Sequence, residues 1–240
     1  KGVSKEDIMI NYTPFGHSDW QTIVSEIKTF GSAGKKTGVV STINGDANVP
    51  FYKELGNVGV DATDIPVIAF SVGEEELAGL DTSPLVGHLA AWNYFMSSES
   101  DENDAFIEAW HEFIGDDNRV TNDPMEATVI GFNLWVKAVE IAGTTEVDVV
   151  RPAMYGLTVP NLTGGIAVMN TNHHLTKPVL IGEILDDGQF EIVYETLAGV
   201  IGDAWTDYLP DSSLLVADWT SPIKCGNYNI KTGVCSGQNY

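Results

Sequence analysis

The stretch Val86-Gly-His-Leu-Ala-Ala-Trp-Asn-Tyr-Phe95 lies where the pattern of the chain changes. It is apolar and rich in strand-forming residues, with aromatic side chains at Trp92, Tyr94 and Phe95. Strands and helices alternate before it, and the residues after it are strongly helical. We interpret it as a crossing strand, a hinge between two lobes, although an ordinary core strand gives the same pattern. Ligand sites favour such junctions, so these aromatic rings are candidates to face a ligand.

Three successive βα units are predicted before this stretch. The expected strands are 7–13, 38–43 and 65–72, and the expected helices are 20–27, 49–55 and one that opens at Gly73. The third strand is almost continuously apolar, as is typical of a parallel strand that is buried on both faces. The sequence therefore predicts the α/β class with a parallel, right-handed, doubly wound sheet.

The residues after the crossing strand predict helices first and strands later. The expected helices are 103–114, 123–142, with Pro124 in its first turn, and 147–155. The expected strands are 166–169, 179–185 and 190–194, and the last two flank Asp186-Asp-Gly188, a hairpin signal. From residue 197 onward the periodicity is poor.

Charge and composition narrow the function classes. The chain has 240 residues, a formal net charge of -22 and 43% hydrophobic residues. So much negative charge disfavours nucleic acid and anionic membrane surfaces as partners. The acidic residues are spread along a chain of ordinary hydrophobicity, which indicates a folded protein with a solvated surface. Because the chain does not begin with Met, we expect a processed or truncated product.

Two cysteines, Cys225 and Cys235, lie close together in a tail rich in Gly and Asn. We predict that they form a disulfide, which implies an oxidising compartment. Two free thiols are the alternative, whereas zinc would need two further ligands that are not nearby in the sequence.

The strand ends predict a binding site. In parallel α/β sheets ligands gather at the carboxyl ends of the strands, which here selects the loops at 17–20, 44–46 and 71–75 together with the crossing strand. None of these stretches contains Lys or Arg. The pattern therefore favours a neutral or cationic ligand, although helix N-termini alone can bind anions.

Sequence patterns that indicate catalysis are weaker than those that indicate binding. The adjacent pair His173-His174 would point to opposite sides of an extended chain, and no HExxH, nucleophile elbow or Gly-rich phosphate loop accompanies it. The stretch 44–48 is similar in composition to part of a calcium loop but lacks the Glu of an EF-hand. We expect no enzyme activity, no cofactor and no metal.

Six stretches together resemble the urea-binding, substrate-binding proteins of ABC-type urea transporters, which belong to the type I periplasmic binding proteins. The resemblance runs from about Tyr12 to Tyr194. It is carried by Gly16-His-Ser-Asp-Trp20, Thr42-Ile-Asn-Gly-Asp-Ala-Asn48, Ser71-Val-Gly-Glu-Glu-Glu76, Gly87-His-Leu-Ala-Ala-Trp-Asn-Tyr-Phe95, Thr121-Asn-Asp-Pro-Met-Glu-Ala127 and Asn172-His-His-Leu-Thr-Lys-Pro178.

The resemblance implies a two-lobed α/β protein that closes on its ligand about a hinge, and it implies that the amino-terminal half of this fold is absent. The expected organisation is a second-lobe α/β segment at 1–85 and a hinge crossing strand at 86–95. The mainly helical carboxyl-terminal part of the first lobe follows at 96–177, then a β-hairpin that returns toward the hinge at 178–196 and an irregular tail at 197–240.

The resemblance also implies a function: a periplasmic or extracellular receptor that delivers urea to the membrane permease of an ABC importer. Short-chain amides or branched-chain amino acids are the alternative ligands. Alternatives of other classes are an amide hydrolase and a truncated receptor half that acts as a structural or interaction module, and the missing half or another chain is a further expected partner. The expected ligand-binding residues are Asn44, Gly45, Asp46, Ser71, Val72, Trp92, Asn93, Tyr94, Asp123, Pro124 and Met125.

Overall fold

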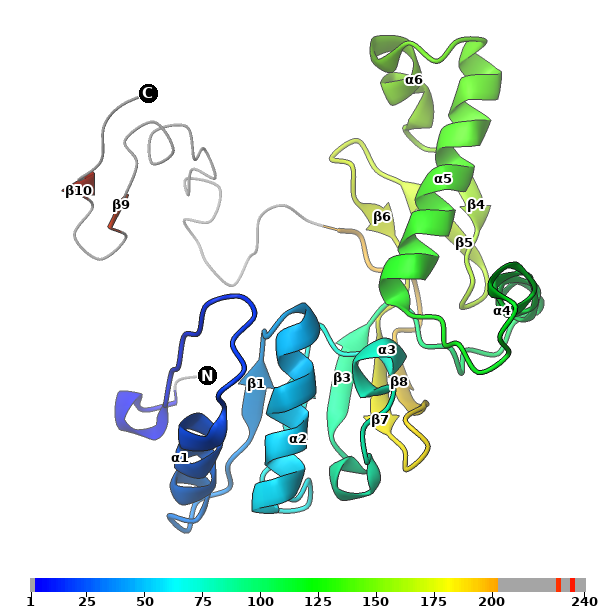
Figure 1. Cartoon of the computed structure of the whole chain (residues 1–240). Coiled ribbons are helices and arrows are strands. Elements are labelled where there is room, and N and C mark those ends of the chain that lie inside the picture. The colour runs from blue at the N-terminus through cyan, green and yellow to red at the C-terminus, as the bar shows by residue number, and fades with distance from the viewer. Residues whose placement is uncertain (1–2, 203–227, 230–233, 236–240) are drawn as a thin grey trace. The chain divides into compact units, whose positions relative to one another are not determined.

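The computed structural model describes residues 3–202 together with two short strands in the tail. These strands are β9 (Tyr228–Asn229) and β10 (Val234–Cys235), which pair antiparallel in a unit of their own. Residues up to Gly202 form the main compact unit, shown in Figure 1. Cys225 lies outside the described residues, so its disulfide with Cys235 stays a prediction. In the described part, no helix is long and apolar enough to cross a membrane.

A five-stranded sheet organises the main unit, in the order β1-β2-β3-β7-β8 (Figure 1). The first three strands run parallel, β7 pairs antiparallel with β3, and β8 pairs antiparallel with β7. This arrangement confirms the predicted α/β class with parallel strands. The strand bounds are β1 (Val39–Ser41), β2 (Val67–Ala69), β3 (Leu89–Trp92), β7 (Leu180–Ile184) and β8 (Phe190–Glu195).

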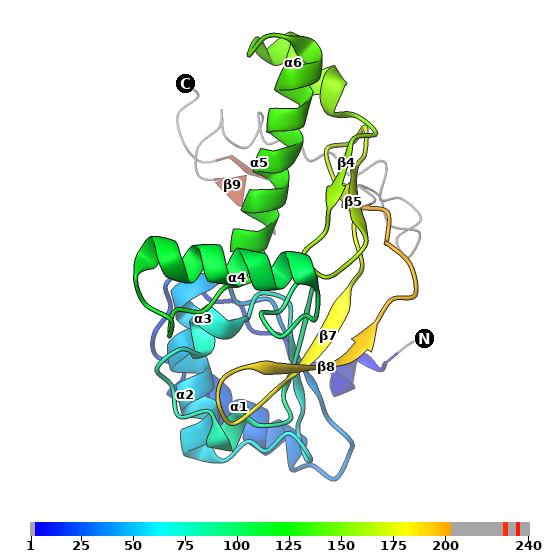
Figure 2. The same ribbon diagram turned by 90° about the vertical axis from the view of Figure 1, so that its right-hand side faces the viewer.

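Three helices pack on one face of this sheet, as Figures 1 and 2 show. They are α1 (Gln21–Gly31), α2 (Asn48–Val58) and α3 (Glu74–Leu77). Alternate strand residues such as Val67, Ala69 and Ala90 are buried against them, as the two-residue period of a strand requires. Residues of the opposite face are less covered, and Val40 is 70% exposed.

The crossing-strand interpretation needs a correction. The stretch 86–95 does contain a strand, β3, but β3 lies inside the sheet, between β2 and β7. Its apolar character comes from burial in that sheet and in the core beyond it, where Ala90, Tyr94 and Phe95 are buried. The chain leaves the sheet only after Trp92.

The prediction of a strand at 7–13 is wrong. Lys5–Asp7 is a short 3-10 helix, and the residues that follow it form no regular structure. The alternation of Ile8, Ile10 and Tyr12 is real, but in the described residues no strand lies beside them, and Tyr12 is 94% exposed. A strand needs a hydrogen-bonded neighbour as well as an alternating pattern.

The segment between β3 and β7 forms a second group of elements. It contains α4 (Asp101–Ile114), α5 (Asp123–Ala142) and α6 (Val147–Met154), followed by a small antiparallel sheet of β4 (Thr158–Pro160), β5 (Ile166–Met169) and β6 (Leu175–Thr176). The bounds of α5 and β5 are those predicted, but β4 and β6 were not expected. Its core joins one face of α5 to this sheet through Ile130, Leu134, Val159, Ala167 and Met169.

The β7–β8 hairpin is confirmed. Its turn contains Gly188 in the left-handed region at a φ of 80°, which only glycine adopts readily. A bulge between Ile181 and Gly182 shifts the register of the pair.

His88 joins the start of β3 to the start of β2 and to the loop that precedes β2. Its Nδ1 accepts a hydrogen bond from the Val67 N–H at 3.1 Å, and its Nε2 donates to the Val60 carbonyl at 3.2 Å. The side chain is completely buried, and this burial lowers the pKa of His88 below its usual value, although the Val60 carbonyl and Asp61 oppose the shift. The imidazole is therefore neutral in the folded chain.

We expect His88 to make stability fall on acidification. The unfolded chain binds a proton at His88 near pH 6.5, whereas the folded chain does so only at lower pH, so this contribution is present above about pH 6.5 and is lost below it. Replacing His88 with leucine should remove that pH dependence and cost about 1–3 kcal/mol at pH 7, because two buried backbone groups lose their partner. Guanidinium unfolding at pH 7 and pH 5 measures both effects, with the exposed His174→Leu as control. An unchanged pH dependence would contradict the prediction.

Candidate functional site

The carboxyl ends of β1, β2 and β3 bring three predicted site residues to one edge of the sheet. The Ser71 hydroxyl donates to Oδ1 of Asn44 at 2.8 Å, and the Trp92 indole N–H donates to the Phe70 carbonyl at 2.6 Å. Asn44 and its neighbour Asp46 are exposed, whereas Ser71 and Trp92 are half-buried. This edge therefore presents polar groups and one large ring to solvent.

The buried residue Asn48 stabilises the loops at this edge. Its buried amide nitrogen donates to the carbonyls of Ile43 at 3.0 Å, Gly45 at 3.2 Å and Ser71 at 3.0 Å. These bonds fix the loop after β1 to the loop after β2. The prediction did not include Asn48. The signal in the sequence was a polar residue at the start of a helix, next to the apolar residues Val49 and Phe51.

Gly73 lies against the Trp92 ring. A Cβ atom added at Gly73 would lie 2.8 Å from Cζ3 of Trp92, closer than real contacts allow. The Gly73 N–H donates to Oε2 of Glu76 at 2.8 Å, which caps the start of α3. The glycine therefore allows the helix start and the ring to meet.

Asn93 and Asp123 join the point where the chain leaves β3 to two later segments. The Asn93 N–H donates to Oδ2 of Asp123 at 3.0 Å, and its side-chain amide donates to the Pro178 carbonyl at 2.6 Å, just before β7. Burial raises the pKa of Asp123, and the Lys177 ammonium and backbone N–H groups oppose the shift. Asp123 thus connects the start of α5 to the residue that follows β3, and its carboxylate is also a hydrogen-bond acceptor.

Tyr94 and Val72 are buried and do not reach the surface of this edge. The Tyr94 hydroxyl donates to Oδ1 of Asn103 at 2.7 Å and lies 2.6 Å from the Thr121 hydroxyl. Asn103 in turn donates to the carbonyls of Met96 and Ser98. Burial raises the pKa of Tyr94. Its role here is to join the start of α4 to the loop before α5.

The other predicted residues lie near the same edge. Gly45 begins the 3-10 helix Gly45–Ala47 and is exposed, as is Pro124 in the first turn of α5. Met125 is half-buried, and its N–H donates to Oδ1 of Asn122, the residue that caps α5.

The predicted site did not include the buried charged residues near the end of β3. Lys177 forms an ion pair with Oε2 of Glu126, and both side chains are almost completely buried. Burial raises the pKa of Glu126 to about 7, and the nearby ammonium opposes the shift. The signal in the sequence was a stripe at every fourth position of α5, Glu126, Ile130, Leu134 and Ala138, all buried.

Glu74 is the second buried carboxylate. Its Oε1 accepts the Met96 N–H at 2.6 Å, and its Oε2 has no hydrogen-bond partner among the described residues. Burial raises the pKa of Glu74 to about 8, while the Met96 N–H favours the ionised form. A run of acidic residues at a helix start is usually solvated, but Glu74 is 1% exposed.

Arg119 adds a positive charge near the edge. Its guanidinium lies 3.7 Å from Oε1 of Glu75, and both side chains are about half exposed. Arg119 comes from the loop between α4 and α5. A cation therefore lies near the edge in the folded chain, although the strand-end stretches themselves contain no Lys or Arg.

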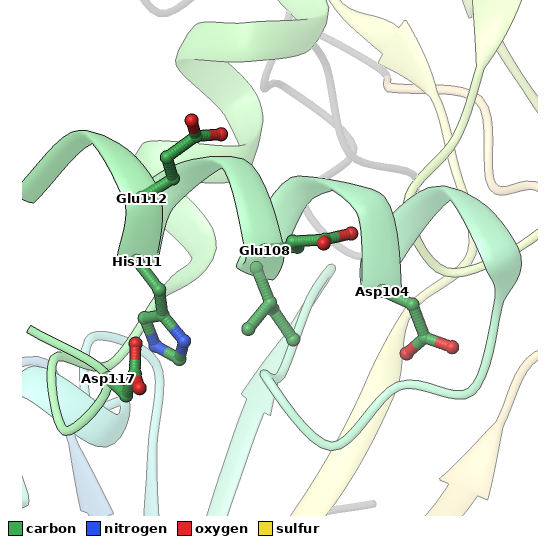
Figure 3. Close-up of a pocket in the computed structure, with 6 residues that line it drawn as sticks. Asp104, Glu108, His111, Glu112 and Asp117 are labelled. Carbon is green, nitrogen blue, oxygen red and sulfur yellow. The ribbon is translucent and has the colours of Figure 1, made fainter. Parts of the chain in front are cut away.

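Two open hollows lie elsewhere, around α4. One, of about 430 Å³, is lined by Asp104, Ile107, Glu108, His111, Glu112 and Asp117. Figure 3 shows the acidic side chains spread along α4, with His111 turned toward the loop that carries Asp117. The other, of about 520 Å³, is lined by residues 96–101 and Asp104. Neither contains a predicted site residue, and in the described part no three His, Cys, Asp or Glu side chains are placed to hold a metal ion.

Comparison with known families agrees with this architecture. Residues 1–211 match the family model described as periplasmic binding protein domain. The match covers most of the chain, and the chain belongs to this family.

Solved structures share the fold at low sequence identity. The solute-binding protein of an ABC transporter from Rhodopseudomonas palustris HaA2, in complex with p-hydroxybenzoic acid, superposes with a TM-score of 0.64 at 19% identity over 78% of this chain. An amino acid ABC transporter substrate-binding protein from Pseudomonas fluorescens Pf-5 gives 0.66 at 16% identity over 80% of the chain. In both cases the chain spans only 51% of the longer protein.

One relative has the name of an enzyme and not that of a binding protein. A protein named limonene hydroxylase from Geobacillus stearothermophilus is 31% identical over 110 residues, which is 46% of this chain and 20% of that protein. The similarity therefore covers a minor part of the named protein.

Proposed function

We propose that this chain is part of a solute-binding receptor that binds urea and delivers it to the permease of an ABC importer in the periplasm or outside the cell. The family match over residues 1–211 carries the receptor class. Three of the groups at the sheet edge, on Asn44, Ser71 and Trp92, are uncharged, which supports a small neutral ligand. The receptor acts by binding and release and has no catalytic step.

The chemistry of urea suits this edge. Urea is flat and neutral, with several N–H donors and one carbonyl. The Asp46 carboxylate and the Ser71 hydroxyl oxygen can accept from its N–H groups, and the Asn44 amide can donate to its carbonyl. Trp92 supplies a flat apolar surface. Asp123 is a further acceptor beside Asn93.

The opposite wall of the site, in this proposal, comes from an amino-terminal half or another polypeptide. Two observations support it: the chain spans about half of its structural neighbours, and α5 exposes two stacked rings, Phe132 and Trp135, 5.9 Å apart. Contacts from both walls exist only when the site is closed, so ligand binding would stabilise closure.

An amino acid or another small acid is the second candidate, and Arg119 favours it. A guanidinium about half exposed near the edge could pair with a ligand carboxylate if Glu75 released it. Short-chain amides are a third candidate, because they share the amide group with urea.

Calorimetry of the intact receptor with urea, acetamide, leucine and 4-hydroxybenzoate tests the proposal. We expect urea to bind, and we expect Asp46→Ala and Asp123→Ala to weaken it by at least roughly tenfold, about 1.4 kcal/mol. Asp64→Ala is the matched control, because exposed Asp64 precedes β2 and so lies toward the opposite edge of the sheet.

Three outcomes would count against the proposal. Unchanged urea affinity in both variants would remove these carboxylates from the site. Tight binding of leucine or 4-hydroxybenzoate without urea binding would overturn the ligand. Ammonia release from urea would show a hydrolase and overturn the receptor class.

A further inference from the structure

The indole ring of Trp92 is held in place from two sides. Its N–H donates to the Phe70 carbonyl at the end of β2, and its Cζ3 edge meets Gly73 at the start of α3. The backbone of Trp92 is fixed by the strand register, in which Trp92 pairs with Leu180 of β7. The ring is half-buried, so its position is set by the core while part of its surface stays accessible.

The hydrogen bond to Phe70 limits what this ring can recognise. Tryptophan has a single donor and no acceptor, and here that donor is occupied by a backbone carbonyl. The accessible part of the ring therefore offers an apolar face or edge and no polar group. Such a surface favours a flat partner that can stack on it.

Polar groups with defined roles lie on the adjoining residues. Ser71, next to Phe70, donates its only hydroxyl hydrogen to Oδ1 of Asn44. Its oxygen is then left to accept, and the amide nitrogen of Asn44 is left to donate. An uncharged donor and an uncharged acceptor are thus fixed next to the residue that holds the ring.

We propose that Trp92 is a specificity-determining residue that selects flat, uncharged ligands by stacking, and that Gly73 is the positioning residue that seats its ring. This inference rests on the proposed binding function of the same edge. It goes further by assigning the selection of ligand shape to one ring and one glycine. A Trp92 that merely filled the core would make no distinction between flat and non-flat ligands.

The test compares urea with sulfamide, which also carries two NH₂ groups but is tetrahedral. In the intact receptor labelled with ¹⁵N, the six tryptophans of this chain should give separate indole N–H signals in a ¹H–¹⁵N spectrum, and Trp92→Phe identifies the signal of Trp92. We expect urea to shift that signal and to bind at least roughly tenfold more tightly than sulfamide, an advantage within the range of aromatic contacts.

Variants separate stacking from core filling. Trp92→Leu should weaken urea by roughly tenfold and remove the preference over sulfamide, whereas Trp92→Phe, which keeps a ring, should retain part of the preference. Gly73→Ala should displace the ring and weaken urea by a similar factor. Gly131→Ala is the matched control: it lies in α5, where an added Cβ meets nothing within 4 Å, and urea affinity should not change.

The outcomes distinguish this inference from the function on which it rests. If urea binds and Trp92→Leu keeps both the affinity and the preference, the inference is overturned while the receptor stands. Benzamide serves as a second flat, uncharged ligand. If urea does not bind but benzamide shifts the Trp92 signal, the urea assignment is wrong and selection of flat ligands by Trp92 is supported. If neither flat ligand shifts the Trp92 signal, the inference is overturned.

Discussion

Replacing Lys177 with methionine is expected to destabilise the chain by about 3–5 kcal/mol, the usual cost of leaving a buried charge without its partner. The Lys177 ammonium pairs with Glu126, and the side chains are 6% and 0% exposed. The same ammonium opposes the rise in the pKa of Asp123 that burial causes, so two carboxylates lose their nearby cation at once. Methionine keeps much of the length and apolar stem of lysine, which separates the loss of charge from the loss of packing.

Guanidinium unfolding, followed by circular dichroism, measures this effect. The double variant Lys177→Met with Glu126→Gln should recover a substantial part of the loss, because it removes the stranded charge as well. Lys35→Met is the matched control: its ion pair with Asp7 is exposed, and such pairs contribute about 0–1 kcal/mol. A loss in Lys177→Met no larger than that of the control would contradict the assignment of a buried ion pair.

Replacing Glu74 with glutamine is expected to change the pH profile of stability. Burial raises the pKa of Glu74 from 4.5 to about 8 in the folded chain, so the folded state holds a proton that the unfolded state has lost. The contribution of this group is therefore present below pH 4.5 and is lost as pH rises through about 8. A shift of this size corresponds to roughly 4–5 kcal/mol.

The glutamine variant should escape this loss. Near pH 4.5 the two proteins should have similar stability, and near pH 9 the variant should be more stable by several kcal/mol. Its side-chain carbonyl can still accept the Met96 N–H, so the connection to the segment after β3 is kept. Unfolding curves from pH 4.5 to 9 measure the difference, with exposed Glu75→Gln as control. Parallel profiles for wild type and Glu74→Gln would show that Glu74 is ionised throughout.

The sequence predicted the elements whose cause is local. The pattern of α5 fixed both ends correctly, because Asn122 and Pro124 mark its start and Gly143 its end. The turn at Gly188 likewise marked the hairpin. Local signals of this kind act within a few residues, so one sequence is enough to find them.

Features that depend on distant neighbours were not predictable in the same way. Ile8–Tyr12 has the alternation of a strand, but pairing is decided by what lies beside it. The position of β3 inside the sheet depends on β7, which begins 88 residues after β3 ends. For the site, the strand-end rule found Asn44, Ser71 and Trp92. Tyr94 is instead enclosed by Asn103 of α4 and by the loop before α5, and Glu74 lies against the segment at Met96.

The pairing of β3 with β7 also has a consequence for how the chain folds. Leu89 lies opposite Glu183, so this half of the sheet cannot close until all the residues between them have been ordered or looped out. The parallel strands β1 to β3 and their helices need only neighbours close in the sequence and can assemble early. Contacts between distant residues are formed slowly. Until they form, β3 presents an open strand edge, the kind of surface on which partly folded chains associate with one another.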